Sequence, residues 1–208
     1  MQLKVTAGLA IGNFACNEDH TNQLMENKTS VTLIGLLKQH QNINGDLKLQ
    51  HALLGTVRNL AVNPAARKQL LEQGILDPCL RLTEKLDLFN AQPVIFKLLQ
   101  TLRFIIDGNP DPAAKIGNSR PLLAKLVEWG AADAQGIKSE SARLLAALIK
   151  HSGRRDVMAL IVECGGLPHV TTMLMSSHVR MMNEAMIALT VLAATLDEDT
   201  VHRLESWL

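Results

Sequence analysis

The sequence contains no tyrosine, and aromatic residues make up only 3% of its 208 positions. Apolar residues nevertheless account for 47% of the chain, and most of them are Leu, Ala, Ile, Val or Met. β-Sheets favour aromatic and β-branched residues, whereas this set suits helices that pack against other helices. The composition therefore argues against a sheet and favours an all-α protein.

An excess of charge and long apolar runs are also missing. The formal net charge is +1, which argues against a nucleic-acid-binding or membrane-surface protein, because such proteins normally carry a basic excess. No stretch approaches the roughly 18 apolar residues of a membrane-spanning helix, and Met1 opens no signal peptide, so we expect no membrane insertion. Cys16, Cys79 and Cys164 are scattered through apolar helical patterns, which favours reduced, buried thiols in a cytoplasmic protein.

Sequence motifs of catalysis are missing as well. The chain has no GxxxxGK[ST] phosphate loop, no GxGxxG, no CxxC pair, no HExxH and no GxSxG elbow. Its seven histidines are dispersed, and no pair of them combines ligand spacing with a neighbouring carboxylate or thiol on one helical face. We therefore expect no catalytic residues, no metal and no cofactor.

The sequence does contain a repeat. A long apolar helical pattern returns at intervals of 46, 45, 43 and 44 residues, with its equivalent positions at Asn13, Asn59, Phe104, Ala147 and Val191. A second landmark, a break between two shorter helical patterns, falls at Asn27, Gly74, Gly117 and Gly165. Glycine and asparagine suit the left-handed turn in which many helices end. This period, without strands between, predicts armadillo-type helical repeats.

We expect each repeat to contain two short helices and a longer third one. The predicted helices are residues 3–16; 19–26, 31–39 and 47–61; 65–73, 76–85 and 93–107; 112–116, 121–129 and 139–151; 156–164, 168–175 and 179–194; and 199–207. Residues 1–208 are thus predicted to form one continuous armadillo-repeat domain of four to five repeats, the first and last incomplete, in a right-handed superhelical solenoid. We expect Leu60, Leu148 and Leu192 to be buried between repeats.

In armadillo repeats the third helix lines the concave surface, so its polar residues are the candidate binding site. Residues four and eight positions before the repeated position, and four after it, share its helical face. The candidate partner-binding residues are Asn13, Asn17, His51, Asn59, Asn63, Gln100, Arg143, His151 and Asn183. Asparagine is mildly unfavourable inside a helix, so its recurrence at positions 13 and 59 favours hydrogen bonding to a partner. The alternative is that both residues bond the adjacent repeat and stiffen the stack.

Several sequence stretches resemble the smg GDP-dissociation stimulator family, known as Vimar in insects. The stretches are GLAIGNFACNE, LQHALLGTVRNLAV, FKLLQTLRFIIDG, KLVEWG, SARLLAALIKHS and HVRMMNEAMIALTVLAA. The resemblance covers the whole chain and suggests a fragment from the C-terminal half. It implies an armadillo guanine nucleotide exchange factor and chaperone whose concave face holds small GTPases of the Rho type, polybasic and prenylated or prenylatable. It also implies that Asn13 and Asn59 belong to the GTPase-binding surface, and that the family's acidic and lipid-accepting regions lie in repeats this chain lacks.

An exchange factor needs no covalent chemistry, because tighter binding to the nucleotide-free GTPase reciprocally weakens nucleotide binding. We therefore expect a non-covalent regulator and not an enzyme. The alternative is an armadillo adaptor that grips an extended peptide without exchange activity. That function predicts a tryptophan four residues before each repeated asparagine, where this sequence has Leu9 and Gly55. The missing tryptophans disfavour the adaptor.

Overall fold

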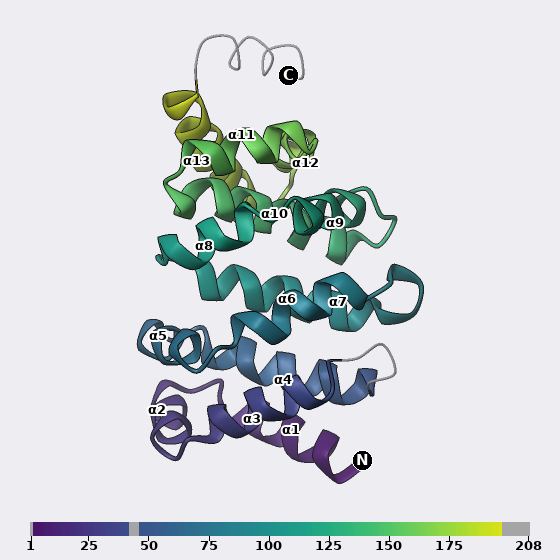
Figure 1. Cartoon of the computed structure of the whole chain (residues 1–208), viewed down its shortest axis with the longest axis vertical. Helices are drawn as coiled ribbons and strands as arrows, with labels where there is room; N and C mark the ends of the chain where they lie inside the picture. Colours follow the sequence, from purple (N-terminus) through teal and green to yellow (C-terminus); the bar gives the residue numbers. More distant parts are fainter. Residues whose placement is uncertain (1, 42–45, 197–208) are drawn as a thin grey trace. The chain divides into compact units, whose positions relative to one another are not determined.

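The computed structural model describes residues 2–41 and 46–196, and these form α-helices with one short 3-10 helix and no β-strand (Figure 1). The all-α prediction is confirmed. The chain divides into two compact units, Met1–Ile105 and Ile106–Leu208, here named unit 1 and unit 2. The helix expected at residues 199–207 lies outside the described residues.

Unit 1 follows the predicted three-helix pattern. Its helices are α1 (Gln2–Phe14), α2 (Glu18–Glu26), α3 (Thr29–Gln39), α4 (Leu47–Leu60), α5 (Pro64–Glu72), α6 (Leu76–Lys85) and α7 (Leu88–Ile106), which ends at the boundary. Only α7 differs clearly from its prediction, because it begins at Leu88 and not at Pro93. A kink at Ala91 (φ −124°, ψ 19°) separates its first turn from the rest. Since Pro93 has no N–H to donate, the break before it sacrifices little hydrogen bonding.

Unit 2 repeats the three-helix pattern. Its elements are α8 (Pro110–Gly117), α9 (Arg120–Gly130), α10 (Gln135–Ser152), α11 (Arg155–Glu163), α12 (Leu167–Thr172), the 3-10 helix η1 (Met173–Met175) and α13 (Val179–Thr195). α10 begins four residues earlier than expected, and the helix expected at 168–175 tightens into η1 over its last turn. Such 3-10 endings are common at helix termini.

The breaks between first and second helices follow the predicted turn chemistry at two of four places. Gly74 and Gly165 adopt left-handed backbone, with φ of 78° and 80°. At the first break the left-handed residue is Lys28, with φ of 55°, and not Asn27. Gly117 is instead a buried residue in the last turn of α8. A Cβ added there would lie 2.3 Å from Cγ1 of Val157, so glycine is needed for the close packing of α8 on α11.

Neighbouring third helices in unit 1 pack at short range. A Cβ added to Gly12 on α1 would lie 2.9 Å from the Thr56 hydroxyl of α4, and Thr56 Oγ1 donates a 2.8 Å hydrogen bond to the carbonyl of Gly8. The same device joins α7 to α4, where Thr101 Oγ1 donates to the carbonyl of Leu54 at 3.3 Å. Glycine and threonine thus bring these helices close enough for side chain-to-backbone hydrogen bonds.

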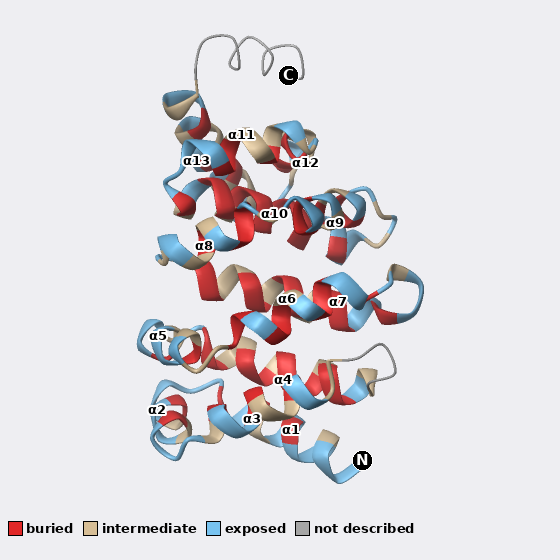
Figure 2. Cartoon of the chain, viewed as in Figure 1, coloured by how far each residue is buried: buried red, intermediate tan, exposed pale blue. Residues whose placement is uncertain are grey.

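The core of each unit is made mostly of buried leucine and isoleucine (Figure 2). Leu60, Leu148 and Leu192 are each 0% exposed, which confirms their predicted burial. They follow the repeated positions Asn59, Ala147 and Val191, which are half-buried. The helical phase read from the sequence therefore holds in both units. Asn13 differs from these repeated positions, because it is exposed and is followed by Phe14, which is 43% exposed.

Candidate partner-binding face

Two cavities adjoin the third helices of unit 1, one at the C-terminal end of α4, where α2 and α5 begin, and one between α1, α4 and α7. The first has a volume of about 390 Å³ and is lined by Ala15, Cys16, Asn17, Glu18, Thr21, Arg58, Asn59, Val62, Asn63 and Pro64. The second has a volume of about 370 Å³ and is lined by Val5, Leu9, Leu47, Lys48, His51, Asn90, Pro93 and Val94. We call the surface of α1, α4 and α7 that carries both cavities the unit 1 face. Four of the predicted site residues, Asn17, His51, Asn59 and Asn63, line these cavities.

Asn59 is engaged with the neighbouring repeat. Its side-chain Nδ2 donates to the carbonyl oxygen of Gly12 at 2.9 Å and contacts Sγ of Cys16 at 3.4 Å. Its Oδ1 accepts a 2.9 Å hydrogen bond from the Arg58 guanidinium. The Gly12 carbonyl belongs to the last turn of α1, where backbone acceptors have no partner within the helix. Asn59 therefore caps the end of α1, as the packing alternative predicted.

Asn13 has a different role. It is exposed at the C-terminal end of α1, and among the described residues its side chain has no hydrogen-bond partner. The two repeated asparagines are thus physically distinct. Asn13 is open to a partner, whereas the amide hydrogens of Asn59 are used within unit 1.

Asn17 and Asn63 are N-cap residues. The side chain of Asn17 accepts hydrogen bonds from the backbone N–H groups of Asp19 and His20 at the start of α2. Asn63 accepts from the N–H of Ala65 at the start of α5. A capping side chain stabilises a helix by about 1 kcal/mol. This capping explains their identity without a partner, although both still line the first cavity.

The sequence reasoning missed a positively charged cluster on the unit 1 face. The Arg58 guanidinium carbon lies 5.0 Å from the centre of the Phe104 ring, and that of Arg103 lies 4.9 Å from it. Lys97 lies over Gly55, with its Cε 4.0 Å from the position of an added Cβ. Burial and the charge of Arg58 lower the pKa of Lys97. The +1 net charge hid this cluster, because it averages over the whole chain.

His51 lies between the second cavity and this cluster. Burial, and secondarily the positive charge of Lys97, lower the pKa of His51 below its usual value. His51 is therefore held in its neutral form near pH 7. Gln100, the predicted site residue on α7, is half-buried.

In unit 2 the predicted residue Arg143 is at the centre of an ion-pair network. Its Nε and Nη2 bond the two carboxylate oxygens of Glu184 at 2.7 and 2.8 Å, and its Nη1 bonds Glu140 at 2.8 Å. The Arg143 and Glu140 side chains are only 14% and 6% exposed. The hydrogen bond to Glu184 raises the pKa of Arg143. This network joins α10 to α13, so the packing of these two helices explains the presence of Arg143 without a bound partner.

His151 and Asn183, also predicted for the site, again differ from each other. His151 Nδ1 accepts the N–H of Gly108 at 3.2 Å, and Nε2 lies 3.2 Å from the Asp107 carboxylate. His151 thus holds the turn before α8. Asn183 is exposed on α13, and its side chain has no hydrogen-bond partner in the described part of the chain.

The described residues show no group of three or more His, Cys, Asp or Glu side chains that could hold a metal. No single helix in the described residues has the length and hydropathy to span a membrane. The segments Arg155–Glu163 and Leu167–Met175 reach that length and hydropathy only when taken together, and they are bent by 89° relative to each other. The three cysteines are free. Cys79 is buried, which raises the pKa of its thiol to about 12, but Cys16 is exposed, contrary to the prediction of burial.

Curated relatives were found over nearly the whole chain, although no family model matches it. The Rap1 GTPase-GDP dissociation stimulator 1-A of Xenopus laevis is 39% identical over 206 residues, which covers 99% of this chain and 33% of the frog protein. The GTPase-GDP dissociation stimulator vimar of Drosophila melanogaster is 30% identical over 224 residues, covering 93% of this chain and 35% of the fly protein. The chain is homologous to the GTPase-GDP dissociation stimulators. It spans about a third of the length of these relatives.

Solved structures confirm the armadillo fold. A designed armadillo repeat protein superposes with a TM-score of 0.78 at 18% identity, covering 98% of this chain and 81% of the designed chain. A second designed armadillo protein, in complex with the peptide (KR)4, gives 0.70 at 20% identity over 90% of this chain and 74% of its own. The armadillo architecture predicted from the sequence is therefore confirmed. The resemblance to the GTPase-GDP dissociation stimulators is borne out by the relatives at 30–39% identity.

Proposed function

We propose that this chain binds a small GTPase of the Rho type on its third helices and promotes release of GDP, as a guanine nucleotide exchange factor and chaperone in the cytoplasm. The observation that carries the proposal is its 39% identity, over 206 residues, to a Rap1 GTPase-GDP dissociation stimulator. A prenylated or prenylatable GTPase with a polybasic tail is the partner that the family resemblance implies.

The unit 1 face offers suitable chemistry for a folded partner. It combines the exposed amide of Asn13, two cavities and a cluster of cations. Convergent polar groups beside apolar cavities are typical of binding sites. Binding there need only be tighter for the nucleotide-free GTPase than for the GDP-loaded one, because that difference weakens GDP binding by the same factor. Exchange by this route requires no residue of the chain to react with the nucleotide, so we propose a regulator and not an enzyme.

The test is the dependence of binding on nucleotide. Rap1 and a Rho-type GTPase, each nucleotide-free or loaded with GDP, are titrated against the chain by calorimetry. We expect at least about ten-fold tighter binding to the nucleotide-free form, equivalent to about 1.4 kcal/mol. Equal affinity for both forms would support the adaptor alternative, and no binding by either GTPase would refute the proposal for this chain.

A further inference from the structure

The three third helices of unit 1 carry positive charge and no carboxylate. α1, α4 and α7 together contain Lys4, Lys48, Arg58, Lys97 and Arg103, and none of them contains Asp or Glu. The carboxylates nearest in sequence stand beyond the helix ends, at Glu18, Asp46, Asp87 and Asp107. By contrast, the third helices of unit 2 contain Glu140 and Glu184, which neutralise Arg143. The charge of the unit 1 face is therefore a local feature.

Two of these cations lack a partner of opposite charge. Among the described residues, neither Arg58 nor Lys97 forms an ion pair, and Nε of Arg58 is buried without a hydrogen-bond acceptor. Buried donors are normally satisfied, so such a group requires an explanation. The charge of Arg58 also disfavours protonation of Lys97, which shows that the two cations act on each other. Two half-buried cations held together this way would be stabilised by an incoming carboxylate.

An apolar cavity adjoins the cations. His51, Gly55 and Asn59 follow one another at single-turn spacing along α4, and Lys97 of α7 lies over Gly55. His51 lines the second cavity with Leu9 and Val94, whereas Asn59 lines the first. A segment lying along α4 would therefore meet, in order, an apolar cavity, the cations and an amide-lined cavity.

We propose that the unit 1 face binds an acidic segment of a partner protein, with a carboxylate received by Lys97 and Arg58 and an apolar side chain in the cavity around Leu9 and His51. The inference rests on the proposed function, in which the segment belongs to the surface of the GTPase. It also implies that a polybasic tail does not bind this face, because cations on both sides would repel each other.

A protein segment fits better than a nucleic acid. Phe104, the aromatic ring within the cluster, is already contacted by the guanidinium groups of Arg58 and Arg103, so it is not an open platform for base stacking. The second cavity is lined by Lys48, His51 and Asn90 and by a majority of apolar side chains, Val5, Leu9, Leu47, Pro93 and Val94, which suit an apolar side chain better than a phosphate backbone.

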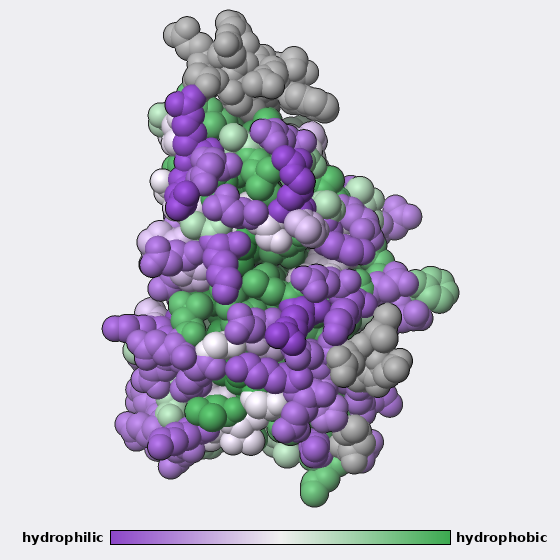
Figure 3. Space-filling model, viewed as in Figure 1, coloured by the Kyte–Doolittle hydropathy of each residue, from purple (hydrophilic) through white to green (hydrophobic). Residues whose placement is uncertain are grey.

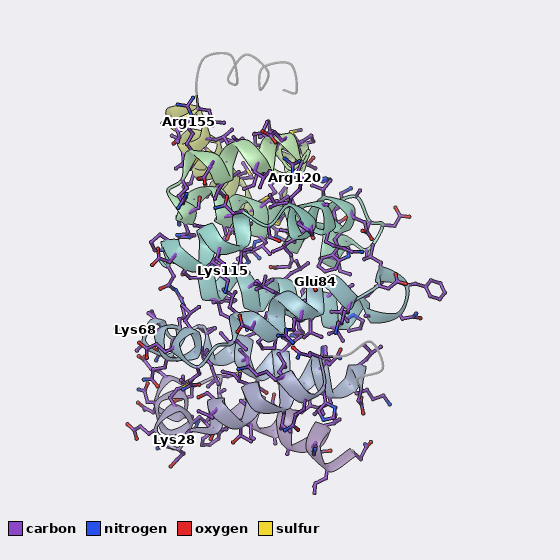
Figure 4. The ribbon with its side chains drawn as sticks, in the orientation of Figure 1. Lys28, Lys68, Glu84, Lys115, Arg120 and Arg155 are labelled. Atoms are coloured by element: carbon purple, nitrogen blue, oxygen red, sulfur yellow. The ribbon has the colours of Figure 1, made fainter. Side chains whose placement is uncertain are left out.

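The test compares two charge reversals that change the net charge equally. Lys97→Glu acts within the unit 1 face, and Lys68→Glu acts on α5, from whose side Lys68 extends (Figure 4). That side of unit 1 is mostly hydrophilic in the view drawn (Figure 3). The carboxylate that Lys97→Glu introduces would gain Arg58 as an ion-pair partner, so we expect this variant to fold. Lys97→Gln serves as a milder second variant, and circular dichroism checks the helicity of all three.

Binding is measured by fluorescence anisotropy. The four labelled ligands are a peptide of alternating Glu and Leu, the (KR)4 peptide, a single-stranded oligonucleotide and GDP-loaded Rap1. We expect the acidic peptide to bind the parent chain and Lys68→Glu equally, and Lys97→Glu about ten-fold or more weakly, with an intermediate loss for Lys97→Gln. Added salt should weaken this binding, because it screens charges beyond about 8 Å at physiological ionic strength.

Three results would overturn the inference: equal binding by Lys97→Glu and Lys68→Glu, preference for (KR)4, or preference for the oligonucleotide. Rap1 separates this inference from the proposed function. If Rap1 binds the parent chain and Lys97→Glu equally, the acidic-segment inference fails while the proposed function stands. If Rap1 and the Rho-type GTPase fail to bind but the acidic peptide binds in the expected order, the proposed function fails and the surface stands.

Discussion

Asn59 on α4 donates a 2.9 Å hydrogen bond from its side-chain amide to the backbone carbonyl of Gly12 on α1. The two residues are 47 positions apart in the sequence, about one repeat. The bond supplies a donor to a carbonyl in the last turn of α1, where the helix itself offers none. It shows that the repeated asparagine position serves packing at least once, and it separates the roles of Asn59 and Asn13.

Asn59→Ala should therefore lower the stability of unit 1. The change removes the donor to Gly12 and the acceptor of Arg58, and a typical intramolecular hydrogen bond contributes about 0.5–1.5 kcal/mol. We expect a loss of about 1–2 kcal/mol in the free energy of unfolding, measured by urea denaturation. A loss below about 0.3 kcal/mol would show that this bond contributes nothing.

Asn13→Ala is the matched control, with the opposite expectation. Its side chain is exposed and has no hydrogen-bond partner in the described structure, so stability should change by less than about 0.5 kcal/mol. Binding of nucleotide-free Rap1 should weaken by about five- to ten-fold, because the amide of Asn13 is available to a partner. Unchanged affinity in Asn13→Ala would place the contact surface elsewhere.

The core prediction concerns the leucines that follow the repeated positions. Leu60, Leu148 and Leu192 are each fully buried, so Leu→Ala at any of them should lower the free energy of unfolding by about 2–5 kcal/mol. The loss combines transfer of the side chain with the cavity left behind. Chemical denaturation of three single variants measures it, and Leu3, which is 82% exposed, provides the control position. Losses below about 1 kcal/mol at all three would contradict the packing of the third helices.

Acidification should destabilise both units through two half-buried histidines. Burial, and then the charge of Lys138, lower the pKa of His169 below its usual 6.5, and burial and Lys97 do the same to His51. The unfolded chain then binds more protons than the folded one, so stability rises with pH. The stability that the two neutral histidines contribute is fully present above about pH 6.5, and it is lost as pH falls through their lowered pKa values. Urea denaturation between neutral and mildly acidic pH should show this loss, and His51→Gln with His169→Gln should reduce it. An unchanged pH profile in the double variant would refute this cause.

The helices and their phase could be predicted from the sequence because apolar spacing repeats in every third helix. The roles of Asn59 and Arg143 could not, because they depend on neighbours one repeat away: Asn59 bonds Gly12, 47 positions back, and Arg143 pairs with Glu184, 41 positions on. Asn17 and Asn63 are local N-caps, a role that the face-by-face spacing did not show. Sequence spacing alone places such residues on one face but does not tell a residue that holds the next repeat from one that is open to a partner.

The cation cluster was missed for a related reason. Arg58 and Lys97 are on different helices, and no motif links them in the sequence. Gly55 gives no signal of the cluster either. A Cβ added there would lie 4.0 Å from Cε of Lys97, an ordinary van der Waals distance, so the position does not require glycine.

The most direct test of the account is the release of fluorescent GDP from Rap1, measured with the parent chain, with the double variant Asn13→Ala and Lys97→Glu, and with Lys68→Glu. If the unit 1 face binds the GTPase and promotes GDP release, the parent chain and Lys68→Glu should accelerate release equally. The double variant should lose about ten-fold or more of that acceleration while keeping its helicity. Equal acceleration by all three proteins would contradict the assignment to this face, and no acceleration by the parent chain would contradict the exchange function.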